Sequence, residues 1–84
     1  MLYVYGIVDT QEPGPVSKAG HENAEIFAVV GEGMAAAASA VSGPEILPNP
    51  ENLWRHERVL EALMTRHTVL PLRFGTIAPS RGLL

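Results

Sequence analysis

Short apolar segments alternate with proline- and glycine-rich stretches along the chain, and each apolar segment predicts one element of secondary structure. The first, LYVYGIV at residues 2–8, is rich in β-branched and aromatic residues, which favour strands. Both faces of this strand are apolar, so we expect it to be central in a sheet. Strand alternation assigns Leu2, Val4, Gly6 and Val8 to one face and Tyr3, Tyr5 and Ile7 to the other. The breaker-rich stretch 11–23 predicts a loop.

The second apolar segment predicts a β-hairpin. Residues 25–30 have the pattern of a strand, and Gly31-Glu32-Gly33 suits a turn because glycine reaches positive φ without steric penalty. The alanine run that follows is ambiguous, since alanine is the best helix former. It is short and directly follows the turn, so we predict a second strand at residues 34–41. Its small side chains would let another element pack closely against it.

A helix start with a physical mechanism follows the second loop. Asn49 is a capping residue, Pro50 suits the first helical position, and Glu51 places an acid in the positively charged first turn. The helix is predicted to continue to about His67. Helical spacing places four apolar side chains on one face, namely Leu53, Leu60, Leu63 and Met64.

Several side chains fall outside that apolar stripe. Glu51 and Arg55 are correctly ordered for an i,i+4 ion pair, and Arg66 near the end of the helix suits its dipole. Trp54 lies about 100° from Leu53 around the helix axis. It is either a rim residue that shields the edge of the core or an anchor for a partner, because tryptophan is favoured in binding hot spots.

The last apolar segment, TVLPLRF at residues 68–74, predicts a strand that returns from the helix, and GTIAPSRGLL leads away from it. Pro71 cannot donate to a β-ladder, so this strand is an edge strand or irregular. The element order is strand, hairpin, helix, strand, with no internal repeat. It predicts a single α+β domain over residues 1–84, in which one main helix packs on one face of a sheet of about four strands.

Composition narrows the functional classes. The chain has 46% hydrophobic and 18% charged residues, a net charge of −3 and no cysteine. The acidic balance without any Lys/Arg run argues against nucleic-acid binding, and the low charged fraction hints at an apolar surface facing a partner. No segment approaches the ~18 apolar residues of a membrane helix, and residues 1–10 lack the pattern of a signal peptide. We therefore expect a soluble cytoplasmic domain.

The sequence contains few residues in patterns typical of catalytic sites. Its serines lack a nucleophile elbow, and no phosphate-binding loop of the Walker or Rossmann type occurs. His56 and His67 are about three helical turns apart and cannot share one ion, so partly buried, hydrogen-bonded histidines are expected instead. The run His56-Glu57-Arg58 is interpreted as solvated helix charges, because consecutive helical residues do not converge. We expect no enzyme, no cofactor and no metal.

Arg73 is the remaining candidate for function. In a regular strand Leu70, Leu72 and Phe74 would share one face, with Pro71 and Arg73 on the other. Arg73 either pairs with a surface carboxylate or offers its planar guanidinium group to a partner's carboxylate or carbonyl oxygens. The sequence leaves both alternatives open.

Three segments together resemble a known family: LYVYGIV, FAVVGEGMAAAASAVS and RHERVLEALMTRHTVLPLRFGT. They are similar to the N-terminal domain of the gas vesicle accessory proteins of the GvpL/GvpF family. The resemblance implies a modified ferredoxin-like α+β domain, followed in longer members by a second domain with long helices. It also implies a role in assembling gas vesicles by associating with the small hydrophobic shell protein or other accessory proteins, and no enzyme activity.

The resemblance also gives the last segment an interpretation. Phe74 is expected to pack in the core, Gly75 to allow a turn, and Arg73 to organise that corner or to contact a partner. The partner-binding candidates are Trp54, Arg73, Phe74, Gly75 and Thr76. The family continues beyond residue 84, so we expect the chain to be the N-terminal domain of a longer two-domain protein. The alternative function is a small ferredoxin-like regulatory or enzymatic domain, with Arg73 and His56 around an anionic ligand.

Overall fold

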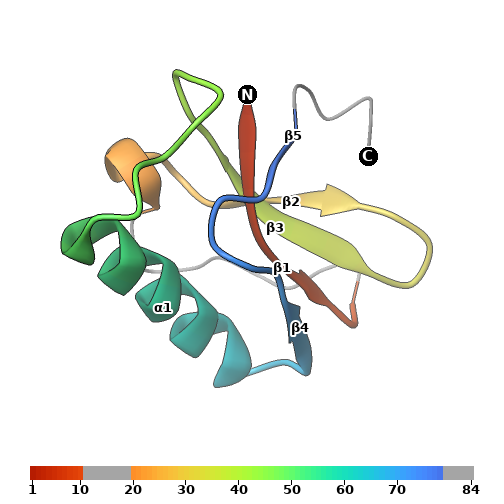
Figure 1. Cartoon of the computed structure of the whole chain (residues 1–84). Helices are drawn as coiled ribbons and strands as arrows, with labels where there is room; N and C mark the ends of the chain where they lie inside the picture. Colours follow the sequence, from red (N-terminus) through yellow and green to blue (C-terminus); the bar gives the residue numbers. More distant parts are fainter. Residues whose placement is uncertain (11–19, 79–84) are drawn as a thin grey trace.

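The computed structural model describes residues 1–10 and 20–78. An antiparallel sheet has the strand order β2-β3-β1-β4, and β5 also pairs with β1. Helix α1 lies across one face of this sheet (Figure 1), which confirms the predicted α+β architecture. The elements are β1 (Leu2–Val8), the single 3-10 turn η1 (His21–Asn23), β2 (Phe27–Val30), β3 (Ala35–Ala40), α1 (Pro50–Met64), β4 (Val69–Pro71) and β5 (Ile77–Ala78). Over these residues, no helix combines the length and apolarity needed to cross a bilayer.

Strand β1 is central, as predicted, but the predicted assignment of its faces is wrong in its second half. Val4 pairs with Ala38 and Gly6 with Ala37, so Tyr5 is an extra residue that forms a β-bulge. The bulge turns Tyr5 and Gly6 toward the same side of the sheet. A Cβ on Gly6 would lie only 3.2 Å from Leu60 Cδ2 of α1. Tyr3, Tyr5 and Val8 consequently all belong to the core on the helix side.

The predicted β2–β3 hairpin is confirmed, with slightly shorter strands than expected. Val30 pairs with Ala35, and the Gly31 amide donates to the Met34 carbonyl at 2.9 Å. Gly33 has φ +72°, a conformation that side chains with a Cβ rarely adopt. The alanine run is therefore a strand, and it lies between β2 and β1.

The helix begins where its capping residues predict. The Asn49 side chain accepts a hydrogen bond from the Asn52 amide at 2.8 Å, and Pro50 is the first helical residue. Glu51 and Arg55 form the predicted ion pair at 3.5 Å. The predicted apolar face is only half right, because Leu53 and Met64 are 42% and 48% exposed. The buried residues of the helix are His56, Val59, Leu60 and Leu63.

The helix ends at Met64, three residues before the predicted end, and Arg66 therefore lies beyond it. The Thr65 hydroxyl donates to the Ala62 carbonyl, and the Arg66 amide donates to the Leu63 carbonyl in a tighter 3-10 pattern. The final predicted strand is also shorter, because β4 covers only Val69–Pro71. It lies at an edge of the sheet, as Pro71 predicts.

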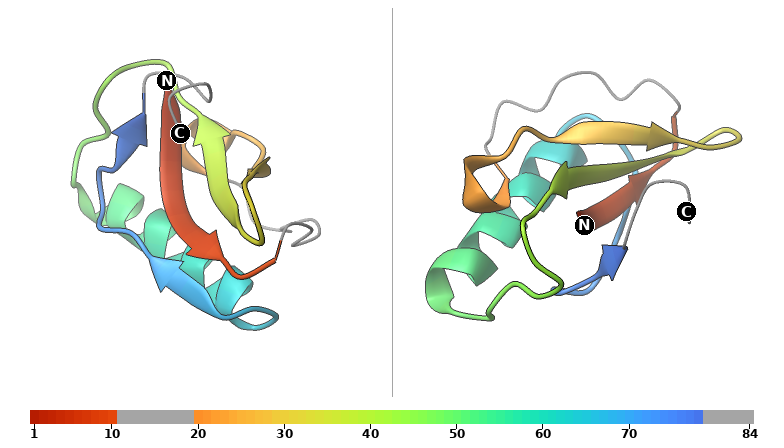
Figure 2. Two further views of the ribbon diagram at one scale, coloured as in Figure 1. Left: turned by 90° about the vertical axis from the view of Figure 1, so that its right-hand side faces the viewer. Right: turned by 90° about the horizontal axis from the view of Figure 1, so that it is seen from above.

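The segment after residue 74 was predicted only to lead away, yet Ile77 and Ala78 pair with β1 as β5 and make a fifth strand. The predicted loop at 11–23 lies mostly outside the described residues, as do residues 79–84. The core lies between the sheet and α1 (Figure 2) and includes a small set of fully buried side chains. The largest of these are Tyr3, Tyr5, Leu63, His21, Val8 and Val59.

Candidate partner-binding site

The candidate residues Arg73–Thr76 form a corner with Leu72, where the chain leaves β4. We call residues 72–76 the corner. The Leu72 amide donates to the Tyr5 carbonyl at 3.0 Å, and the Val4 amide donates to the Thr76 carbonyl at 2.9 Å. Within the corner, the Thr76 hydroxyl donates to the Arg73 carbonyl at 2.8 Å, and Gly75 has φ +92°. Backbone hydrogen bonds to β1 therefore hold the corner at both ends.

Two buried side chains attach the corner to the helix. The Gly75 amide donates to the Tyr3 hydroxyl at 3.0 Å, and that hydroxyl lies 2.9 Å from His56 Nδ1. His56 Nε2 lies 3.1 Å from the Leu72 carbonyl. Because a carbonyl oxygen only accepts, Nε2 carries a proton. In the neutral imidazole, Nδ1 then accepts from the Tyr3 hydroxyl.

Burial maintains these protonation states. It lowers the pKa of His56, against the opposing effect of its hydrogen bond to the Leu72 carbonyl. Burial also raises the pKa of Tyr3 to about 12, although the Gly75 amide acts in the opposite direction. Both groups are therefore neutral near pH 7, which is the state in which Nδ1 accepts from the Tyr3 hydroxyl.

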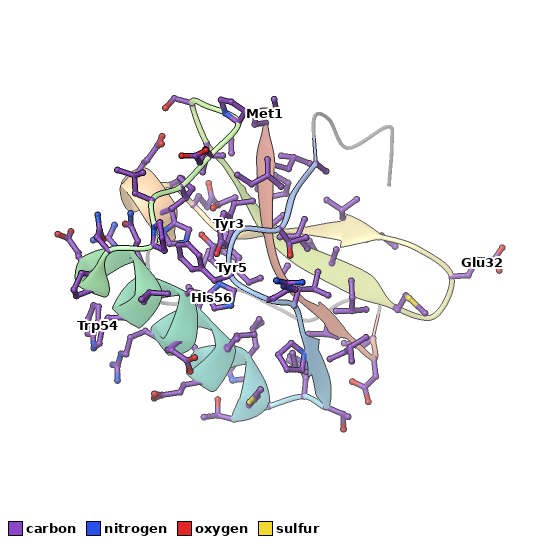
Figure 3. All side chains as sticks on the ribbon, in the orientation of Figure 1. Met1, Tyr3, Tyr5, Glu32, Trp54 and His56 are labelled. Atoms are coloured by element: carbon purple, nitrogen blue, oxygen red, sulfur yellow. The ribbon has the colours of Figure 1, made fainter. Side chains whose placement is uncertain are left out.

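Five aromatic side chains surround these bonds, and we call them the ring cluster. They are Tyr3, Tyr5, His21, His56 and Phe74. The His21 and Tyr3 ring centroids are 4.2 Å apart, and the His56 and Phe74 centroids are 5.6 Å apart. Figure 3 shows Tyr3, Tyr5 and His56 gathered between α1 and the sheet. The Tyr5 hydroxyl lies 2.7 Å from Ser39 Oγ and accepts from the His21 amide at 2.9 Å.

His21 is the unusual member of the ring cluster. Its side chain is fully buried, yet neither ring nitrogen has a hydrogen-bond partner among residues 1–10 and 20–78. Burial is the main cause that lowers its pKa to about 4, and His56 and Arg55 add to this effect. His21 is therefore neutral near pH 7 and serves as a packed ring on Tyr5, 5.6 Å away between centroids.

A groove of about 700 Å³ separates the exposed side of the corner from α1. Its lining comes from two segments that are far apart in the sequence. These residues are Leu53, His56, Glu57, Leu60, Pro71, Leu72, Arg73 and Phe74. Most of the lining residues are apolar, and Glu57 and Arg73 are the charged ones.

The predicted site residues are only partly brought together. Arg73 is exposed in the groove, and its guanidinium group pairs with no carboxylate of the described residues. Phe74 packs against the core, and Gly75 makes the turn, as expected. Trp54 is 60% exposed and points away from the sheet (Figure 3). Its ring lies 5.5 Å from the Arg58 guanidinium carbon, outside the groove.

The interpretation of His56 as a solvated helix charge is wrong, because its side chain is 5% exposed. The expectation of a buried, hydrogen-bonded histidine is the one confirmed at this position. The sequence contained a signal for it, since His56 lies three and four residues before Val59 and Leu60 on one helical face. Both ring nitrogens are engaged, so His56 offers no donor to an anionic ligand. Among residues 1–10 and 20–78, no three His, Asp or Glu side chains are placed to hold a metal ion.

Comparison with known proteins identifies the family. The model of the family described as Gas vesicle synthesis protein GvpL/GvpF matches residues 1–82. The chain is 33% identical over 78 residues to gas vesicle protein F of a Nostoc species, an alignment that covers 90% of this chain and 32% of that protein. The chain therefore spans about a third of the length of this relative.

Solved structures support the same family assignment. The crystal structure of GvpF from an Anabaena species superposes with a TM-score of 0.85 at 32% identity, over 94% of this chain and 34% of that one. GvpF from Microcystis aeruginosa gives a TM-score of 0.87 at 31% identity, over 98% and 35%. The resemblance noted in the sequence and the predicted ferredoxin-like type of fold are confirmed. The chain belongs to the GvpL/GvpF family of gas vesicle synthesis proteins.

Proposed function

We propose that this chain takes part in gas vesicle assembly as an accessory or minor structural protein, located in the cytoplasm at the gas vesicle. It would act by binding the shell protein or another assembly factor through the corner and its groove. The family supports the process, since its members are gas vesicle synthesis proteins. The corner supports the mode of action. The proposal assigns no catalytic step to this chain.

The observation that carries the proposal is the contrast between Arg73 and the backbone that holds it. The corner is fixed by hydrogen bonds to Tyr5, Val4 and Tyr3, whereas the Arg73 side chain is exposed and lacks an ion-pair partner among the described residues. A preorganised backbone presents the guanidinium group in one position, which lowers the entropic cost of binding a partner. Exposed Leu53 on the other side of the groove adds apolar area.

Co-expression with the major shell protein tests the proposal. Arg73→Ala should weaken retention of the shell protein about tenfold, as expected for the loss of one charge-assisted contact. Arg66→Ala is the matched control, because Arg66 is also exposed but lies beyond the end of α1 and outside the groove. Circular dichroism should report the same fold for both variants.

Three outcomes would contradict the proposal. Equal weakening by Arg73→Ala and Arg66→Ala would show only general charge attraction. Unfolding by Arg73→Ala would identify the side chain as an organiser of the corner. Full retention of the shell protein by Arg73→Ala would place recognition elsewhere.

A further inference from the structure

The face of the sheet opposite α1, which we call the outer face, carries a second concave surface. A hollow of about 560 Å³ is lined by residues of β1, β2, β3 and β5 and of the corner. The lining residues are Val4, Ile7, Val29, Val30, Gly31, Met34, Ala36, Leu72, Thr76, Ile77 and Ala78. None of them is charged. This hollow is separate from the groove beside Arg73, and only Leu72 borders both.

The register of the sheet explains the shape of the hollow. Ala36 of β3 pairs with Ile7 of β1 on one side and with Val29 of β2 on the other. Directly paired residues point to the same face, so a small side chain lies between two larger ones. The bulge at Tyr5 is what places Ile7 on this face. The result is a depression along β3, and Met34, which is 49% exposed, lines it beside the hairpin turn.

The described residues around the hollow offer few free hydrogen-bond donors or acceptors to a bound segment. Its floor strands, β1 and β3, are paired on both sides, so they present no free edge to a further strand. The Thr76 hydroxyl is already bonded to the Arg73 carbonyl. A segment that enters such a site must satisfy its own backbone groups, because a buried unpaired N–H or C=O is costly. An α-helix does this, whereas an extended segment does not.

The acidic residues near the hollow favour one orientation of a bound segment. Exposed Asp9 directly follows β1, whose last residue, Val8, pairs with Ala35 at the start of β3. Exposed Glu32 is in the hairpin turn next to Gly31. Both carboxylates therefore lie at the hairpin end of the hollow. They favour a cationic side chain or a helix N-terminus, which carries positive partial charge, at that end.

We propose that the hollow on the outer face binds an amphipathic α-helix of a partner protein, with an aliphatic face on Ala36 and a basic N-terminal end beside Glu32. This surface is independent of the groove, so the proposal goes beyond the function proposed above. The helix fills the depression with aliphatic side chains, and its basic end meets the two carboxylates.

Two labelled helical peptides test this proposal on the whole 84-residue chain. They share one face of leucine and alanine, and one carries lysines at its N-terminus where the other carries glutamates. Fluorescence anisotropy should show binding of the lysine-ended peptide, about tenfold tighter than that of the glutamate-ended one. Glu32→Lys should reverse this preference.

Substitutions then locate the site. Met34→Asp should weaken binding of the lysine-ended peptide at least about tenfold, because it places a desolvated charge against the aliphatic face. Leu47→Asp is the matched control, since Leu47 is 61% exposed but lines neither concavity, and it should leave binding unchanged. Circular dichroism and the urea midpoint should be unchanged in both variants.

The proposal is overturned if neither peptide binds, if Met34→Asp and wild type bind equally, or if Leu47→Asp weakens binding as much as Met34→Asp. It is also overturned if analytical ultracentrifugation shows a dimer that Met34→Asp dissociates. In that case the outer face is covered by a second copy of the chain. Reversal by Glu32→Lys together with loss in Met34→Asp supports the proposal.

Discussion

The two faces of the sheet are both apolar, yet they are built in different ways. The face under α1 carries aromatic rings whose polar atoms are joined in a chain from Gly75 through Tyr3 and His56 to Leu72. The outer face around Ala36 carries aliphatic side chains without such bonds. Hydrogen bonds are directional, so the helix side admits one arrangement, whereas aliphatic packing tolerates several. The helix side is thus the more narrowly specified of the two faces, and the outer face carries the hollow proposed above to bind a helix.

The contrast predicts that substitution of Leu63 has the largest effect on stability, because this side chain is only 2% exposed between α1 and the sheet. Leu63→Ala should lower the free energy of unfolding by about 2–5 kcal/mol, through lost burial and the cavity that remains. Urea denaturation measures this. A loss below about 1 kcal/mol would mean that the helix side is loosely packed and that the comparison is mistaken.

Removing one oxygen atom tests the hydrogen bonds on the helix side of the sheet. Tyr3→Phe keeps the ring but leaves the Gly75 amide without an acceptor and His56 Nδ1 without a donor, which should cost about 1–3 kcal/mol. Hydrogen exchange at the Gly75 amide should accelerate more than exchange at the Gly31 amide, which donates to the Met34 carbonyl in the hairpin. Uniform acceleration along the chain would instead indicate global destabilisation without a specific role at the corner.

Acid should weaken the helix side through His21. The folded side chain takes up a proton near a pKa of about 4, against 6.5 for an unperturbed histidine. The unfolded state therefore binds more protons between these values, so stability falls as the pH drops from 6.5 toward 4 and levels off below. We expect a loss on the order of 1–2 kcal/mol, because local opening at the one-turn η1 relieves part of the cost.

The lowered pKa of His56 acts in the same direction. His21→Phe keeps a ring at this buried position and removes its titration, so it is the matched variant. Its stability should depend less steeply on pH between 6.5 and 4 than that of the wild type. Identical slopes would rule out His21 as a source of acid sensitivity.

The smallest effect is expected on the outer face. Met34→Ala should change the free energy of unfolding by no more than about 0.5 kcal/mol, because the side chain is half exposed at the rim of the hollow. Thermal denaturation of Met34→Ala beside Leu63→Ala gives the comparison directly. A large loss in Met34→Ala would show that the outer face contributes to the fold as the helix side does.

Local signals in the sequence predict the elements well. The Asn49-Pro50-Glu51 start, the Gly31–Gly33 turn and the β-branched and aromatic residues of 2–8 all act locally, and each corresponds to an observed element. The edge position of β4 follows from the missing amide proton of Pro71. These features need no knowledge of distant contacts, which is why pattern and propensity suffice for them.

The features that the sequence did not predict depend on contacts between distant segments. The bulge at Tyr5 is set by pairing with β3, and its only local sign within LYVYGIV is Gly6, because a glycine inside a strand often accompanies a bulge. The sequence allowed both a solvated and a buried His56, and the partners that engage its buried ring, Tyr3 and Leu72, lie 53 and 16 residues away. The two residues of β5 form a strand only because β1 has a free edge beside β4. In the candidate site, the turn at Gly75 was predictable, but the groove that Arg73 shares with α1 was not.

The central position of β1 has a consequence for how the protein is made. Its partners are β3, β4 and β5, so β1 leaves the ribosome before residues 35–40, 69–71 and 77–78, with which it pairs. Until these are synthesised, LYVYGIV is an unpaired apolar strand in a growing chain. Such long-range pairing slows folding and prolongs exposure to aggregation. The nascent chain is therefore most vulnerable during the interval between synthesis of β1 and synthesis of β5.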